Sequence, residues 1–138
     1  RYVLFLMIPR SDGLYEGYDG LDFLFPFRDV GRGTDIVLYG AGTYGQRLYC
    51  YLEKTGFCRV VLWVDRNYAE LQKMGLDVEN PSKLQESDCN IVVIANTYER
   101  SRKELYRELS GKYPTKQICV IDEQLILSIQ TRKAFGLV

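Results

Sequence analysis

A glycine-rich turn over Gly40–Gly45 (GAGTYG) holds the residues of this sequence that are best suited to chemistry. Glycine at the first position permits a tight turn, and glycine at the third lets the backbone approach a pyrophosphate without a Cβ in the way. The last glycine allows a following helix to pack closely on a sheet, and the start of that helix offers N–H groups and partial positive charge to a phosphate. The spacing predicts a turn that receives the diphosphate of a nucleotide, although glycines that only shape the fold stay an alternative.

An acidic residue, Asp65, closes the second apolar run, 20 residues past Gly45. At the end of a second strand, a carboxylate can accept hydrogen bonds from the hydroxyl pair of a ribose. An acid followed by Arg66 and Asn67 can also begin a turn, so a purely structural role stays open. Arg66 could meet the 2′-phosphate of NADP, but Asp65 beside it would repel that phosphate. NAD or a nucleoside-diphosphate sugar therefore fits the pattern better than NADP.

Residues that commonly carry catalysis are scarce in the sequence. The 138 residues include no histidine, which removes the commonest general base and the usual Ser/His and Cys/His nucleophile pairs. No Tyr-x-x-x-Lys pair is present to serve a short-chain dehydrogenase. The strand before Gly40 also lacks the acid that methyltransferases using S-adenosylmethionine commonly carry there. We therefore expect a module that binds a nucleotide and has no catalytic or metal site of its own.

Composition argues against several other classes of function. Lysine plus arginine equals aspartate plus glutamate at 18 each, so the charge gives no reason to expect a nucleic-acid partner. The four cysteines form no CxxC pair, and we expect reduced core thiols in a cytoplasmic protein. The longest apolar run, Tyr2–Ile8, is far shorter than the roughly 20 residues that span a bilayer. Because the sequence begins at Arg1, we expect a piece of a longer polypeptide whose neighbouring domains are its partners, and a homo-oligomer stays open.

Short apolar runs alternate with helical patterns from residue 35 onward, which is typical of βαβ units and a parallel sheet. The expected strands are Ile36–Tyr39, Val60–Val64, Ile91–Ala95 and Ile118–Ile121. We expect a three-layer, Rossmann-like α/β domain with a mostly parallel sheet over residues 35–138, after an amino-terminal extension or boundary segment over residues 1–34. The first strand should lie between the second and third, with a crevice at their carboxyl ends floored by Gly40, Asp65 and Ala95.

Two longer helices should follow the first and third strands. The first is expected from Tyr44 to Lys54, with a capping box of Thr43 and Gln46 at its start and Gly56 at its end. The second should begin after a cap at Asn96–Glu99 and end at Gly111, and its buried apolar stripe would consist of Tyr98, Leu105, Tyr106 and Leu109. The charges of this helix, Arg102 among them, balance at i,i+4 spacing and indicate a solvated face.

The segments around these elements give weaker signals. Between the second and third strands we expect a short strand at Leu76–Val78 and a short helix that begins at Asn80 and Pro81. The aromatic run Phe23–Phe27 is expected to pack outside the sheet or at the boundary with a neighbouring domain.

Three stretches carry a resemblance to a known family: Phe25–Gly45 (FPFRDVGRGTDIVLYGAGTYG), Val60–Tyr68 (VVLWVDRNY) and Ile91–Thr97 (IVVIANT). Together they resemble a small Rossmann module attached to bacterial glycosyltransferases and other enzymes of surface-polysaccharide assembly. More distantly, they are similar to the amino-terminal cofactor domain of polysaccharide nucleotide-sugar epimerases and dehydratases. The likeness covers residues 23–122.

The resemblance implies nucleotide contacts from three places in the chain, namely Gly40, Gly42, Thr43, Tyr44 and Gly45, then Asp65, then Asn96 and Thr97. It implies no catalytic residue. The leading hypothesis is a non-catalytic module that holds NAD or a nucleotide sugar within a cytoplasmic enzyme of cell-surface glycan synthesis. Two alternatives stay open: the cofactor domain of an NAD-dependent sugar epimerase or dehydrogenase whose catalytic part lies outside this sequence, and a scaffold that has lost nucleotide binding.

Overall fold

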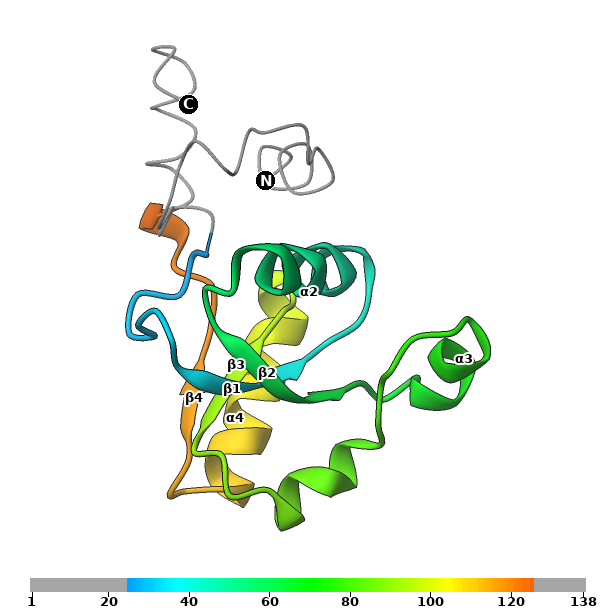
Figure 1. Cartoon of the computed structure of the whole chain (residues 1–138). Helices are drawn as coiled ribbons and strands as arrows, with labels where there is room; N and C mark the ends of the chain where they lie inside the picture. The colour runs from blue at the N-terminus through cyan, green and yellow to red at the C-terminus, as the bar shows by residue number, and fades with distance from the viewer. Residues whose placement is uncertain (1–24, 126–138) are drawn as a thin grey trace.

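Four parallel strands form one sheet with the order β2-β1-β3-β4 (Figure 1). The structure is a computed structural model that describes residues 25–125. The strands are β1 (Asp35–Tyr39), β2 (Arg59–Val64), β3 (Ile91–Ile94) and β4 (Gln117–Cys119). The α/β class with a parallel sheet is confirmed, and so is the placement of β1 between β2 and β3. Tyr39 lies opposite Val64 on one side and Ile94 on the other, so the carboxyl ends of these three strands meet at one edge of the sheet.

Helices cover both faces of the sheet, with α2 (Thr43–Thr55) on one face and α4 (Glu99–Lys112) on the other (Figure 1). Successive residues of β1 point alternately into the two core layers on either side of the sheet. Ile36 and Leu38 belong to the core cluster that includes α2, whereas Val37 and Tyr39 belong to the cluster that includes α4. Because both faces of β1 are buried, its sequence is apolar without alternation.

The start of α2 differs from the expected capping box. Gly42 is the cap residue and has no side chain with which to cap the helix, and Thr43 is the first helical residue. Gln46 points its amide back to the turn, where Nε2 donates to the carbonyl oxygen of Ala41 at 2.9 Å. The expected end is confirmed, because Gly56 adopts a left-handed conformation with φ 65° that few other residues tolerate.

The apolar stripe predicted for α4 is partly wrong. Leu105 and Leu109 are buried as expected, but Tyr98 is 75% exposed and Tyr106 also lies at the surface. Tyr98 is exposed because it occupies the cap position, before the first helical residue. Tyr106 is exposed because it lies one position after Leu105, which rotates it by about 100° around the helix. Arg102, predicted for the solvated face, is instead only 7% exposed.

The end of α4 also differs from the prediction. Gly111 lies inside the helix, which continues to Lys112, and Tyr113 is the cap residue. Its backbone N–H donates to the carbonyl oxygen of Leu109 at 2.8 Å. A backbone hydrogen bond from outside the helix thus closes the last turn without a left-handed glycine.

Between β2 and β3 the structure adds a helix that the sequence analysis did not predict, α3 (Tyr68–Lys73). In place of a strand at Leu76–Val78 there is a single parallel bridge, from Val64 to Glu79. The short helix at Pro81 is confirmed as η2 (Pro81–Glu86), and the Oδ1 atom of Asn80 caps it by accepting from the N–H of Ser82 at 3.0 Å.

The segment before β1 contributes to the core. Phe25 and Phe27 are buried in the α2-side cluster, and their rings lie 4.9 Å apart between centroids. The carbonyl oxygen of Pro26 accepts a hydrogen bond from the N–H of Asp122 at 2.7 Å, so the segment lies against the stretch that follows β4. Phe25 and Phe27 therefore pack within the core beside the sheet and not at a boundary with another domain. Phe23 and the run Tyr2–Ile8 lie outside the described residues.

The cysteines are all free, but the expectation that they are core thiols holds for only part of the set. Cys58 and Cys119 are buried, Cys89 is half-buried and Cys50 is exposed. Cys50 lies on the solvent side of α2, one residue before the buried Tyr51. Among residues 25–125, no helix is long and apolar enough to cross a membrane.

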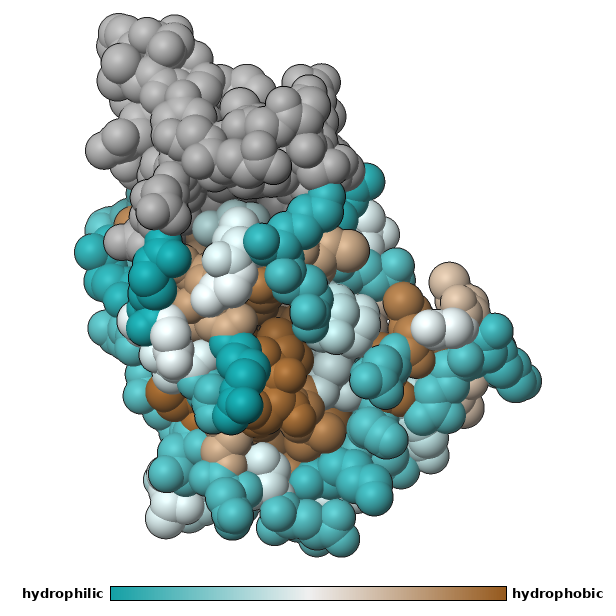
Figure 2. All heavy atoms as spheres, in the orientation of Figure 1, coloured by the Kyte–Doolittle hydropathy of each residue, from teal (hydrophilic) through white to brown (hydrophobic). Residues whose placement is uncertain are grey.

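Among residues 25–125, no strand pairs with the outer edge of β2 over most of its length. β2 pairs with β1 on one side, and on the other side its bridge from Val64 to Glu79 lies at its carboxyl end. Val61 in the middle of the strand is exposed. Apolar surface gathers where β2 runs, with hydrophilic residues around it (Figure 2).

Candidate functional site

A cleft of about 880 Å³ opens at the carboxyl ends of β1 and β3, where the strand order reverses. In open α/β sheets this crevice is the usual position for a ligand, and the volume falls in the range of small-molecule sites. Of the residues predicted to contact a nucleotide, only Gly45 does not line this cleft. Those that do are Gly40, Gly42, Thr43, Tyr44, Asp65, Asn96 and Thr97. Three segments that are far apart in the sequence therefore meet at one surface.

The three glycines of the turn have different roles. Gly40 has φ 123°, and a Cβ there would lie 2.7 Å from the carbonyl oxygen of Ala95. A Cβ on Gly45 would overlap the carbonyl oxygen of Gly40, so only glycine lets α2 approach the end of β1 this closely. A Cβ on Gly42 would meet no atom within 4 Å. Gly40 and Gly45 are thus required by the close packing of the turn, whereas Gly42 leaves the cleft side of the turn open.

The first turn of α2 presents its amino terminus to the cleft. The N–H groups of a first helical turn have no carbonyl partner within the helix, and they carry the positive end of its dipole. Gly42 and Thr43 are exposed there. Tyr44 has its side chain in the core, 4% exposed, and this burial raises the pKa of its phenol. Tyr44 can therefore serve an anion through its backbone rather than through its hydroxyl.

Asp65 is joined to the glycine turn by a hydrogen bond within the protein. Its Oδ2 accepts from the N–H of Ala41 at 2.7 Å, and its Oδ1 accepts from the N–H of Asn67 at 2.7 Å. The second bond is the turn-initiating role that the sequence left open. Each carboxylate oxygen keeps a further lone pair, so the group can still accept from a hydroxyl. Asp65 fixes the shape of the turn and keeps acceptor capacity toward the cleft.

The turn is also tied to β2 through backbone and ring donors. The N–H of Gly40 donates to the carbonyl oxygen of Val64 at 2.8 Å, and the indole Nε1 of Trp63 donates to the carbonyl oxygen of Gly40 at 2.9 Å. The Trp63 ring in turn stacks on Tyr49 of α2, with centroids 4.1 Å apart. These contacts fix the position of the turn relative to β2 and α2.

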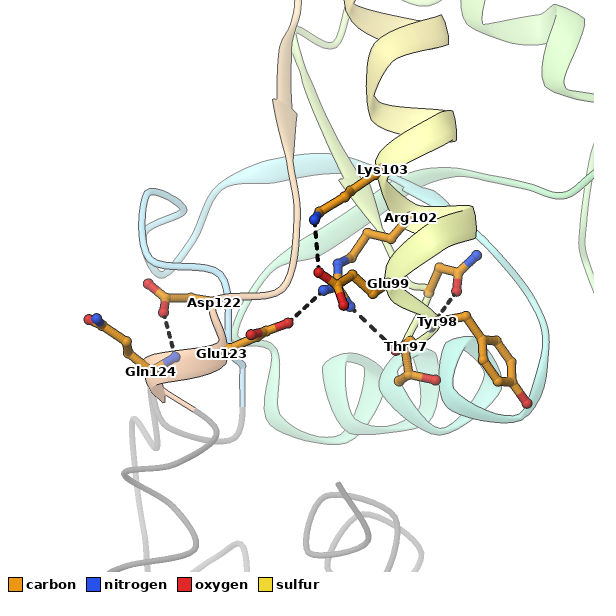
Figure 3. A network of polar contacts seen from close by, with 9 residues as sticks. Thr97, Tyr98, Glu99, Arg102, Lys103, Asp122, Glu123 and Gln124 are labelled. Carbon is orange, nitrogen blue, oxygen red and sulfur yellow. Dashed lines mark hydrogen bonds and ion pairs between the residues drawn. The ribbon is translucent and has the colours of Figure 1, made fainter.

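On the other side of the cleft, the loop after β3 is ordered by its own side chains. The Oδ1 atom of Asn96 accepts from the N–H of Tyr98 at 2.8 Å, which turns the chain into α4. The carbonyl oxygen of Thr97 accepts from Nη1 of Arg102 at 3.4 Å. Nη2 of the same guanidinium donates to Oε1 of Glu123 at 2.8 Å, so Arg102 links this loop to the stretch after β4 (Figure 3).

Several residues of the cleft were not predicted, and four of them carry charge: Arg47, Arg66, Glu104 and Glu108. Arg47 lies one helical turn after Thr43 and so shares its face of α2, a spacing that could have indicated it. Nη2 of Arg66 pairs with Oε1 of Glu108 at 2.9 Å across the cleft wall. Burial raises the pKa of the neighbouring Tyr39, and the Arg66 charge opposes part of that effect.

Within residues 25–125 no group of three or more histidine, cysteine, aspartate or glutamate residues is arranged to hold a metal ion. Comparison of the chain with known protein families, with curated proteins and with solved structures found no match. The cleft is therefore interpreted from its own geometry and chemistry.

Proposed function

We propose that this chain binds a nucleotide with a diphosphate, either NAD or a nucleotide sugar, in the cleft at the carboxyl ends of β1 and β3. The observation that carries the proposal is the meeting of the glycine turn, Asp65 and Asn96–Thr97 around one cavity. The helix start at Gly42 and Thr43 supplies N–H donors and dipole charge for the diphosphate. Asp65 supplies an acceptor for the ribose.

The domain is of the Rossmann type in this proposal. A parallel sheet, a glycine turn between β1 and α2 and an acid directly after β2 support that assignment. The space above Gly42 supports it further, since it is open and lies on the cleft side of the turn.

The proposed role is binding without turnover by this chain alone. The sequence has no histidine, the commonest general base, and no Tyr-x-x-x-Lys pair of the kind that serves short-chain dehydrogenases. Given the sequence resemblance to modules of surface-polysaccharide enzymes, the parent we propose is a cytoplasmic glycosyltransferase or another enzyme of that class. Its catalytic part would belong to neighbouring domains.

A thermal-shift screen tests the proposal with NAD, NADP, S-adenosylmethionine and nucleotide sugars. A ligand at about 100 times its dissociation constant stabilises the folded state by about 2.7 kcal/mol, which moves the melting temperature by several degrees. NAD or a nucleotide sugar should raise the melting temperature of the chain, and Gly42→Val should remove that rise. If none of these compounds shifts the transition at millimolar concentration, the proposed function is wrong.

The absence of turnover has its own test. The purified chain should neither reduce NAD nor epimerise a nucleotide sugar, because its sequence has neither a histidine nor a Tyr-x-x-x-Lys pair. Measurable turnover that disappears with Gly42→Val would show that the chain is itself an enzyme.

A further inference from the structure

A second pocket of about 330 Å³ lies directly beside the cleft. The two cavities share three lining residues, Tyr39, Arg66 and Glu108. The ion pair between Arg66 and Glu108 therefore belongs to the wall that separates them. Beyond that wall the second pocket is formed by α3, η2 and the carboxyl-terminal half of α4.

The ion pair in the shared wall is weak, while Arg66 also has a hydrogen bond with Tyr39 that the pair does not depend on. The side chains of Arg66 and Glu108 are 64% and 54% exposed, and ion pairs in that setting contribute little to stability because water screens them. A ligand that offers Arg66 a phosphate or hydroxyl oxygen would replace Glu108 at small cost. The two cavities would then form one continuous groove from the glycine turn to η2.

The lining of the second pocket combines an apolar floor with polar groups at its rim. Leu84 and Leu109 are buried at its base, and the rings of Tyr68 and Tyr113 are half-buried around it. Ser82 and Lys112 bring a hydroxyl and an ammonium group to the rim, and both are exposed. Aromatic and aliphatic walls with donors at the edge suit a planar heterocycle whose rim carries nitrogen and oxygen acceptors.

We propose that this second pocket is the base subsite of the nucleotide site, separated from the main cleft by the Arg66–Glu108 pair. The inference rests on the proposed function and extends it. A nucleotide would place its diphosphate at Gly42, its ribose between Asp65 and Arg66, and its base beyond the pair against Tyr68 and Tyr113. The base, rather than the sugar or nicotinamide end, then occupies the pocket between η2 and α4.

A pair of substitutions on η2 tests the assignment. Ser82→Trp puts a large ring at the mouth of the second pocket without touching the main cleft, and Lys83→Trp puts the same ring on the next residue, which does not line the pocket. The probes are ADP, UDP and inorganic pyrophosphate, titrated by calorimetry. Ser82→Trp should weaken ADP or UDP by tenfold or more and leave pyrophosphate unchanged. Lys83→Trp should change none of the three.

The outcomes separate the base subsite from the proposed function. If pyrophosphate and ADP bind the unmodified chain and Ser82→Trp affects neither, the base subsite is overturned while nucleotide binding in the cleft stands. If Ser82→Trp and Lys83→Trp weaken ADP equally, the effect is not local and the subsite is also overturned. If the unmodified chain binds no probe, both proposals fail. Circular dichroism checks the folding of each variant, and Ser82→Leu replaces Ser82→Trp where the larger ring disturbs it.

Discussion

The Oδ2 atom of Asp65 accepts a hydrogen bond from the backbone N–H of Ala41 at 2.7 Å, which ties the end of β2 to the glycine turn after β1. Ala41 is fully buried, so its N–H loses a hydrogen-bond acceptor within the protein if the carboxylate is removed. Asp65→Ala should therefore lower the free energy of unfolding by about 1–3 kcal/mol. Urea denaturation measures this, with Asp77→Ala, an exposed acid on the loop after α3, as the control.

The same variant has a second effect on binding. Loss of the ribose acceptor should weaken NAD by one to two decades, since a charge-assisted hydrogen bond is worth about 1.5–3 kcal/mol. Removal of the negative charge should also reduce the discrimination against NADP. Equal NAD affinity in Asp65→Ala and the parent chain would restrict Asp65 to its structural bond with Ala41.

Gly42 and Gly45 should respond in opposite ways to the addition of a side chain. Gly42→Val meets no atom within 4 Å and has an extended, allowed backbone with φ −76°, so the domain should still fold. Because valine is a poorer cap residue than glycine, the melting temperature should fall by only a few degrees. Its side chain fills the space for the diphosphate, so binding of NAD should be lost. Gly45→Ala places a Cβ against the carbonyl oxygen of Gly40, and we expect it to unfold the domain or lower its melting temperature sharply. A stable Gly45→Ala variant would contradict the close approach of α2 to the turn.

The ion pair of Arg102 and Glu123 joins a buried cation to an exposed carboxylate, so it can show what an unpaired buried charge costs in stability. Glu123 is 67% exposed, whereas Arg102 is buried. Glu123→Ala leaves a buried guanidinium without its carboxylate and should cost about 1–2 kcal/mol of stability. Arg102→Met leaves the carboxylate in water and fills the space with an apolar chain, so it should cost less. Chemical denaturation of both variants decides the order, and a larger loss for Arg102→Met would refute this explanation.

Stability should fall in alkaline solution because of a buried thiol. Burial raises the pKa of Cys58 from its ordinary value of 9.0 to about 11. Between these two values the unfolded chain loses the proton and the folded chain keeps it, so rising pH favours unfolding by up to about 1.4 kcal/mol per pH unit for this group. The free energy of unfolding should therefore decline from pH 9 to pH 11. Cys58→Ala should show a shallower decline, and an identical slope in both proteins would rule out the thiol as its source.

Much of the sheet and of the candidate site could be predicted from the sequence because those features are local. Four apolar runs and a glycine turn identify β1 to β4 and the entry to α2, and chain connectivity then sets the strand order. The position of Asp65 after β2 follows from the same pattern. These residues need no distant partner to be recognised.

Features that depend on distant partners were missed. Arg102 has the periodicity of a charged surface, and its burial depends on the Thr97 carbonyl and on Glu123 beyond β4. The wall between the two cavities requires Arg66 and Glu108, 42 positions apart in the sequence. For Phe25 and Phe27 the sequence left two placements open, and packing beside the sheet is decided by the stretch around Asp122. In each case tertiary packing decides a placement that local pattern cannot.

The hydrogen bond from the N–H of Asp122 to the carbonyl oxygen of Pro26 puts the entrance and the exit of the described fold next to each other. The ion pair of Arg28 with Asp122 reinforces the same junction. These two contacts join the segment before β1 to the segment after β4, two stretches that are far apart in the sequence. The junction therefore acts as a clasp on the sheet, and displacement of either segment would also release the other.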